Sequence, residues 1–230
     1  MTVSKRYAIT KEQNKKTRLF ILCFAHLFVS LHRAHYWRTH MNPVDESNSI
    51  SNDIALELAR LHVLRGVEFT RQLKLITERR EFQLVKDETD IFTAISETDE
   101  DYPSLFNAAR RAVEHGFRVY ILPNPKGIRT ADFIFLRKGV YRMYDLKTVQ
   151  GKSSILNRLV ESIGQTNHVL LNMATDYNAR LLALQIQKYF EWNPNAGQIL
   201  IFKGNKMLSV TRRTLDDKNF IAQFTRQYNK

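Results

Sequence analysis

The stretch FRVYILPNPKGIRTADFIFLRKGVYRMYDLK, residues 117–147, decides the fold, because helical periodicity gives way in it to short apolar runs separated by turn residues. Three runs are rich in aromatic and β-branched residues, and we expect each to be a strand: 117–122, 132–136 and 140–147. Only Arg137-Lys138-Gly139 separates the last two runs, and a turn this short joins antiparallel strands. The stretch therefore predicts a hairpin preceded by a third strand.

The segments on either side return to helical patterns. Pro103 and Ser104 begin a predicted helix that ends at Gly116. A second helix is expected from Ser153 or Ser154 to about 164, followed by a strand at 168–172. The resulting order, αβββαβ, predicts an α/β (α+β) fold with a mixed sheet flanked by helices.

Other segments extend this core in both directions. Apolar residues at helical spacing predict one long amphipathic helix over 53–80. After the core we expect a helix at 178–190, a hairpin of 198–202 and 206–210, and a final helix at 216–228.

The charge of the 230-residue chain, +12 in all, is unevenly distributed. Residues 1–40 carry +7, residues 41–103 carry −7 and residues 104–230 carry +12. We therefore expect a basic and apolar N-terminal segment (1–45), a helical acidic accessory region (46–103) and the α/β domain (104–230). The basic excess favours a polyanionic partner such as nucleic acid, although a solvated surface can have the same composition. The single cysteine, Cys23, excludes an intramolecular disulfide framework and a cysteine-based zinc cluster.

The N-terminal segment has three interpretations. Its basic start precedes a 13-residue apolar run, Leu19–Leu31, which resembles a secretory signal or anchor but is too short to span a membrane. It is otherwise an amphipathic, membrane-surface segment, or a disordered leader from a start assigned too early, with Met41 as the true start. We expect a cytoplasmic protein, with export or membrane-surface attachment through residues 1–40 as the alternative.

Two acids and a lysine occupy one end of the predicted hairpin. Asp132 begins the second strand, and Asp145 and Lys147 end the third, so antiparallel pairing brings them together. Asp145 and Lys147 are two residues apart and share a face of the sheet. The two carboxylates can hold Mg²⁺, and the lysine can stabilise charge on a phosphate. A structural salt bridge at the sheet edge is the alternative.

Further polar residues surround this hairpin end. Gln165 is a candidate catalytic residue or the solvated end of a helix, and Glu114 is a candidate third carboxylate or a surface residue. Candidate nucleic-acid contacts, which a solvated face or helix capping would also explain, are Lys126, Arg129, Arg137, Lys138, Arg142, Lys152, Ser153 and Arg158.

Asp132 followed by Asp145-Leu146-Lys147 on this topology resembles the PD-(D/E)xK nuclease superfamily. Residues 104–175 also resemble the C-terminal tRNA-nuclease toxin domains of CdiA-type contact-dependent inhibition proteins. The segments that carry this resemblance are TADFIF (130–135), YDLKT (144–148), GKSS (151–154), and Gln165 before VLLN (169–172).

The resemblance implies a nuclease-like domain that cleaves RNA, and tRNA in particular. Its catalytic residues would be Asp132, Asp145, Lys147 and Gln165, with Mg²⁺ on the two aspartates and a cognate immunity protein as partner.

The sequence departs from the superfamily pattern at two positions. Ala131 stands where proline is usual, and Asp145 where glutamate is commoner. Some toxins of this type belong instead to the barnase/EndoU/colicin/RelE group, which cleaves RNA without a metal. That mechanism would rely on Lys147, Thr148, Ser153 and Gln165. A DNA endonuclease and a non-catalytic nucleic-acid-binding protein of a mobile element are the remaining alternatives.

Overall fold

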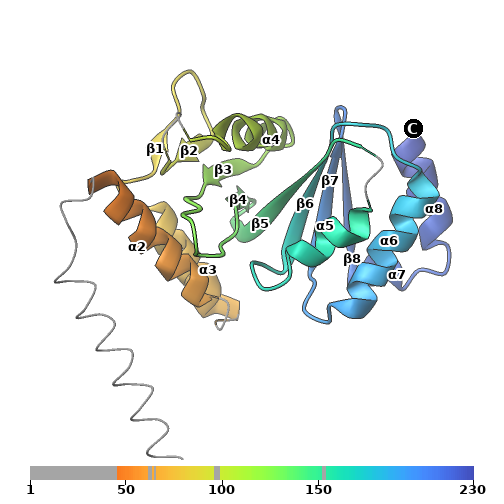
Figure 1. Cartoon of the computed structure of the whole chain (residues 1–230). Helices are drawn as coiled ribbons and strands as arrows, with labels where there is room; N and C mark the ends of the chain where they lie inside the picture. The colour runs from red at the N-terminus through yellow and green to blue at the C-terminus, as the bar shows by residue number, and fades with distance from the viewer. Residues whose placement is uncertain (1–45, 62–63, 65, 96–98, 152–153) are drawn as a thin grey trace, which may run out of the picture. The chain divides into compact units, whose positions relative to one another are not determined.

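The antiparallel hairpin predicted near the centre of the chain is present in the middle of the sheet (Figure 1). The computed structural model describes residues 46–61, 64, 66–95, 99–151 and 154–230. The hairpin consists of β4 (Phe133–Arg137) and β5 (Val140–Val149). Lys138 and Gly139 have φ angles of 51° and 76°, the left-handed conformation that a tight hairpin turn needs.

In the described part of the chain, eight strands form one mixed sheet whose spatial order is the chain order, β1 to β8. β5, β6 and β7 are parallel neighbours, as are β2 and β3, and the other pairs are antiparallel. The other strands are β1 (Gln83–Leu84), β2 (Ile91–Thr93), β3 (Arg118–Ile121), β6 (His168–Met173), β7 (Gln198–Lys203) and β8 (Lys206–Thr211).

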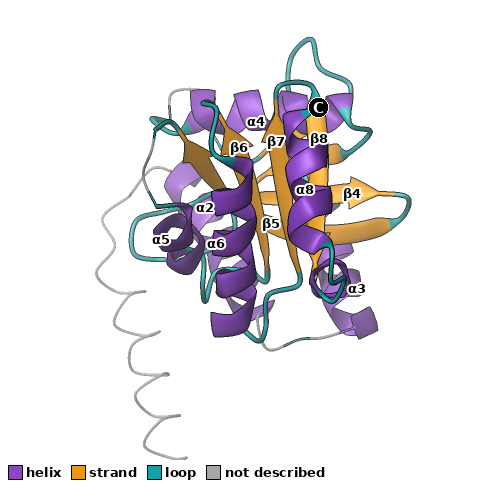
Figure 2. Ribbon diagram, turned by 90° about the vertical axis from the view of Figure 1, so that its right-hand side faces the viewer, coloured by secondary structure: helices purple, strands orange, loops and turns teal. Residues whose placement is uncertain are grey.

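Helices cover both faces of this sheet. α4 (Tyr102–Glu114) packs through Ala108 and Ala112 against one face, in a core that contains Tyr144. The helices packed on the opposite face are α2 (Glu46–Arg60), α3 (Gly66–Thr77), α5 (Ile155–Glu161), α6 (Ala179–Trp192) and α8 (Phe220–Asn229). Figure 2 shows α6 and α8 lying across the sheet on that side. The predicted α/β class and the αβββαβ core, α4-β3-β4-β5-α5-β6, are confirmed.

Because side chains alternate along a strand, neighbouring residues of β5 belong to different cores. Met143 packs with α2 and α3, whereas Tyr144 packs with α4 and lies 4.8 Å from Phe135, ring centre to ring centre. Val149, further along the same strand, packs in the core that α5, α6 and α8 cover. β5 therefore joins all three buried clusters.

Three local predictions were wrong. The single helix expected over 53–80 is two helices, because the chain turns at Gly66, whose φ of +61° lies outside the helical region. The accessory region 46–103, expected to be helical, also contains the strands β1 and β2, which are too short to show alternation. The final helix expected at 216–228 is α8, which begins only at Phe220, and a separate short helix, α7 (Arg212–Leu215), precedes the predicted range and begins with a Thr211/Thr214 capping box.

Residues 1–45 lie outside the described residues, and the interpretations of the apolar run remain predictions. Within the described residues, no helix combines the length and the apolar character that crossing a bilayer requires.

His168 begins β6 in a crowded, half-buried position. Its ring centre lies 5.5 Å from that of Tyr144, and a Cβ atom at position 197, where the chain has glycine, would lie 3.1 Å from its Nε2. Burial, with a smaller contribution from the nearby charge of Arg142, lowers the pKa of His168 from 6.5 to about 4. The imidazole is therefore neutral at pH 7.

This lowered pKa predicts acid sensitivity of the fold. Between pH 6.5 and about 4, the unfolded chain binds a proton at His168 that the folded chain does not bind, so stability falls as the pH falls. Because the side chain is partly exposed, we expect about 1–2 kcal/mol of the loss between pH 7 and pH 4 to disappear in His168→Gln. Urea denaturation of both proteins across this range measures the difference, and parallel pH profiles would contradict it.

Candidate active site

The sheet forks at the point where β5 leaves β4. β5 pairs with β4 as far as Tyr144, which lies opposite Phe133, and from Asp145 onward it pairs with β6 alone. Asp132 closes the fork, since its N–H donates to the Tyr144 carbonyl oxygen at 3.0 Å. Its carboxylate Oδ2 accepts the N–H of Leu146 at 2.5 Å. A side-chain oxygen thus replaces the main-chain acceptor that a continuing ladder would supply.

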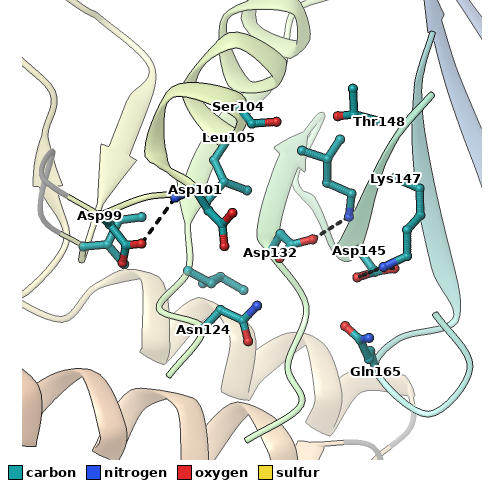
Figure 3. A pocket seen from close by; sticks show the side chains of 13 residues that line it. Asp99, Asp101, Ser104, Leu105, Asn124, Asp132, Asp145, Lys147, Thr148 and Gln165 are labelled. Carbon is teal, nitrogen blue, oxygen red and sulfur yellow. Dashed lines mark hydrogen bonds and ion pairs between the residues drawn. The ribbon is translucent and has the colours of Figure 1, made fainter. Parts of the chain in front are cut away.

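Asp145 and Lys147 form an ion pair beside this fork. Lys147 Nζ donates to Asp145 Oδ1 at 3.1 Å and lies 2.9 Å from Oδ2. Oδ2 is buried and accepts no hydrogen bond from the described residues, so the ammonium group of Lys147 is its ion-pair partner alone. The Asp145 side chain is 2% exposed and that of Lys147 is 14% exposed. The predicted convergence of Asp132, Asp145 and Lys147 is therefore present (Figure 3).

Burial dominates the electrostatics of the two carboxyl groups. Burial, followed by the adjacent charge of Asp145, raises the pKa of Asp132 from 3.8 to about 7. Burial also raises the pKa of Asp145, and Lys147 partly opposes that rise. The interaction between the two carboxyl groups favours the proton on Asp132, because Lys147 stabilises the charged form of Asp145. The pair thus shares one proton near neutral pH, as close carboxylates do when no cation separates them.

An open cavity of about 280 Å³ exposes these groups to ligands. Besides the fork residues, it is lined by side chains from the start of α4, the end of β3 and the loop before β6. They are Ile95, Asp99, Asp101, Ser104, Leu105, Leu122, Asn124, Leu146, Thr148 and Gln165. With four aspartates and one lysine, the lining is acidic (Figure 3).

The carboxylate pair fits a hard divalent cation, which prefers oxygen ligands. Asp145 Oδ2 is buried and poorly satisfied, and two adjacent carboxylates gain from a positive charge between them. Within the described residues, no group of three or more His, Cys, Asp or Glu side chains is arranged to hold a metal. A Mg²⁺ ion here would be held by Asp132 and Asp145, with water or phosphate oxygens completing its shell.

Of the other polar residues predicted for the site, Gln165 and Thr148 line the cavity and Glu114 does not. Gln165 lines the cavity and donates to the Glu161 carbonyl oxygen at 3.3 Å. Thr148, predicted for the metal-free mechanism, also lines it, and its buried Oγ1 has no partner among the described residues. Glu114 is exposed at the end of α4, whereas the beginning of α4 lines the cavity.

The predicted basic contacts are scattered. Lys126 and Arg158 are exposed, and Arg129 donates from the loop after β3 to the Glu161 carbonyl oxygen at 2.7 Å. Arg137 and Lys138 lie at the turn of the hairpin, at its opposite end from Asp145. Arg142 is exposed on β5, and its charge acts on His168. Lys152 and Ser153 lie outside the described residues.

Asp99, Asp101, Ser104 and Asn124 line the cavity but were not predicted. Asp99 and Asp101 belong to the acidic stretch that precedes α4, and Asp99 accepts the N–H of Asp101 at 3.4 Å. The only sequence signal was that acids directly precede the helix start at Pro103. These residues lie near the hairpin because α4 packs against β3, and the sequence does not indicate that packing.

Comparisons with known proteins do not assign the chain to a family. No protein-family model and no curated protein matches it. A solved structure, the CdiA-CT/CdiI toxin and immunity complex from Burkholderia pseudomallei, matches with a TM-score of 0.33 and 12% identity over 57% of this chain and 96% of that chain. Its name includes the CdiA-CT designation of the toxin domains that the motif resembles, but similarity at this level assigns neither family nor activity.

The hydrogen bond from the Leu146 N–H to the Asp132 carboxylate predicts that two substitutions of Asp132 will differ in their effect on stability. Asp132→Asn keeps an acceptor for the Leu146 N–H and removes a buried acid, so we expect stability at pH 7.5 to change by less than about 1 kcal/mol. Asp132→Ala leaves that N–H unpaired and opens a cavity, which costs about 2–4 kcal/mol. Urea denaturation of the three proteins tests the difference. Equal losses in both variants would show that the hydrogen bond contributes little.

Proposed function

We propose that this chain is a nuclease that hydrolyses phosphodiester bonds in RNA. The observation that carries the proposal is the pair of buried, adjacent carboxyl groups of Asp132 and Asp145, accompanied by Lys147, in a cavity open to solvent. Perturbed acids that share a cavity with a fixed cation are typical of active sites. A purely structural salt bridge would not require two acids beside one lysine.

The charge of the surrounding chain supports a nucleic-acid substrate. Residues 104–230 carry a net charge of +12, and Lys126, Arg129 and Arg158 are exposed on segments that precede or follow cavity residues. These side chains would contact the phosphate backbone without reading sequence. The acidic lining of the cavity repels phosphate, which is why the proposal includes a cation at the carboxylate pair.

In this mechanism the residues have separate tasks. Asp132 and Asp145 would hold Mg²⁺ with their carboxylate oxygens, and Lys147 would place a positive charge beside the reacting phosphate, where negative charge develops. When bound, Mg²⁺ supplies Lewis acidity and lowers the pKa of a coordinated water. Gln165 and Thr148 contribute polar groups that can orient the phosphate or the attacking water.

The motif resemblance makes the proposal more specific than the geometry does. On that ground we propose tRNA as the RNA, toxin-like growth inhibition as the role and a cognate immunity protein as the partner. The residues that carry this step are 130–135, 144–148 and Gln165.

Cleavage assays with matched variants test the nuclease proposal. We expect purified protein with Mg²⁺ to cleave total RNA and tRNA. Asp145→Asn should lose at least about 10³-fold in rate, and Lys147→Met about 10²–10³-fold, because each removes charge stabilisation from the transition state. Asp216→Asn, an exposed aspartate after α7, is the matched control and should retain full activity. Circular dichroism confirms that every variant is folded.

The same assay separates the alternatives. Cleavage that persists in EDTA contradicts the role of Mg²⁺ and favours the metal-free mechanism through Lys147, Thr148 and Gln165. Cleavage of plasmid DNA but not RNA would identify a DNA endonuclease. A folded protein that binds RNA and cleaves neither substrate would be a nucleic-acid-binding protein, and the nuclease proposal would be wrong.

A further inference from the structure

A second cavity, of about 400 Å³, lies beside the candidate active site. Gln165 lines both cavities, so the segment before β6 forms the wall between them. Met143 lines the second cavity, and Asp145, two residues along the same face of β5, lines the first. Two residues of a strand span about 7 Å. A single nucleotide can bridge this distance, with its phosphate in the first cavity and its base in the second.

The lining of the second cavity combines an apolar wall with side-chain amides. Phe69, Met143 and Ile163 supply the apolar part, and Gln165, Asn167 and Asn195 supply amides. A nucleobase requires this combination, because its faces are apolar and its edges carry hydrogen-bond donors and acceptors. Amide side chains pair well with base edges, since each presents a donor and an acceptor side by side.

The side-chain amides in the lining of the second cavity differ in whether they already form hydrogen bonds within the protein. Asn193, at the end of α6, is committed, because its Nδ2 donates to the Tyr189 hydroxyl and its Oδ1 accepts the N–H of Asn195. The side chains of Asn167 and Asn195 make no hydrogen bond with any described residue, although they line the cavity. His168, also in the lining, is neutral at pH 7 and does not compete as a charged group. Uncommitted amides at an apolar wall are available to a ligand.

We propose that the second cavity binds the unstacked base of the nucleotide next to the scissile phosphate, with Asn167 and Asn195 hydrogen bonding its edge and Phe69 contacting its face. The proposal rests on the proposed function for the position of the phosphate. It adds a preference for single-stranded substrate, because a base paired in a duplex cannot leave the stack to enter a pocket without loss of its pairing.

Binding measured without cleavage tests the proposal. Labelled 2′-O-methyl oligonucleotides exclude 2′-hydroxyl-dependent cleavage, and Ca²⁺ in place of Mg²⁺ keeps a hard cation available to the carboxylate pair, with gel analysis to confirm that the strands stay intact. Fluorescence anisotropy with the full chain compares oligoadenylate, oligocytidylate and oligouridylate with an abasic strand of equal length and charge. We expect at least one base-bearing strand to bind about tenfold more tightly than the abasic strand, as one well-paired base edge provides.

Three variants assign that preference to the cavity. Asn167→Ala removes an amide that the fold does not use, and Phe69→Leu removes the ring while keeping an apolar side chain. Each should bring the base-bearing strand to within about threefold of the abasic strand, whose own affinity stays unchanged. Asn205→Ala, at the exposed turn between β7 and β8, is the matched control and should keep the preference.

The outcomes distinguish this proposal from the nuclease proposal. Equal binding of base-bearing and abasic strands, or a preference that survives both cavity variants, overturns the base site even if the protein cleaves RNA. A base preference that both variants abolish, in a protein that cleaves nothing, supports the base site and contradicts the nuclease.

Discussion

The hydrogen bond from the Leu146 N–H to the Asp132 carboxylate is the interaction on which the candidate site depends. β4 and β5 separate at this point, and a main-chain N–H at a fork between strands must find another acceptor or remain unpaired at a cost. A side-chain oxygen meets that need and places a carboxyl group inside the opening. The same fork turns the free edge of β5 toward the cavity, where Asp145 and Lys147 lie.

This arrangement has an electrostatic cost. Asp132 is 9% exposed and Asp145 is 2% exposed, and they lie close enough for each to shift the pKa of the other. Two buried negative charges cannot both persist beside a single lysine, so a proton or a cation must supply the missing charge. A fold that needed only a salt bridge would gain stability from an apolar residue at one of these positions. This electrostatic cost supports the proposed role of the pair in catalysis.

Local patterns predicted the elements near the hairpin because each had its own signal. The turn at Lys138 and Gly139 and the apolar run at 132–136 indicated antiparallel strands, and the pairing of strand ends then brought Asp132 to Asp145 and Lys147. Long-range packing could not be predicted in this way. Asp99 and Asn124 enter the cavity only because α4 and the end of β3 meet the fork. Arg137 and Lys138 appeared near the site in sequence, but a hairpin places its turn far from its open end.

The spatial order of the strands, which is the order of synthesis, has a consequence for how the protein forms. Each strand pairs with the one made just before it, so the loops that must close are short and the sequence separation between partners stays low. The sheet can therefore grow by addition at one edge while the chain leaves the ribosome. Every residue that lines the candidate active site precedes 166, so the later strands and α8 are added to a sheet in which the residues of the candidate site have already come together.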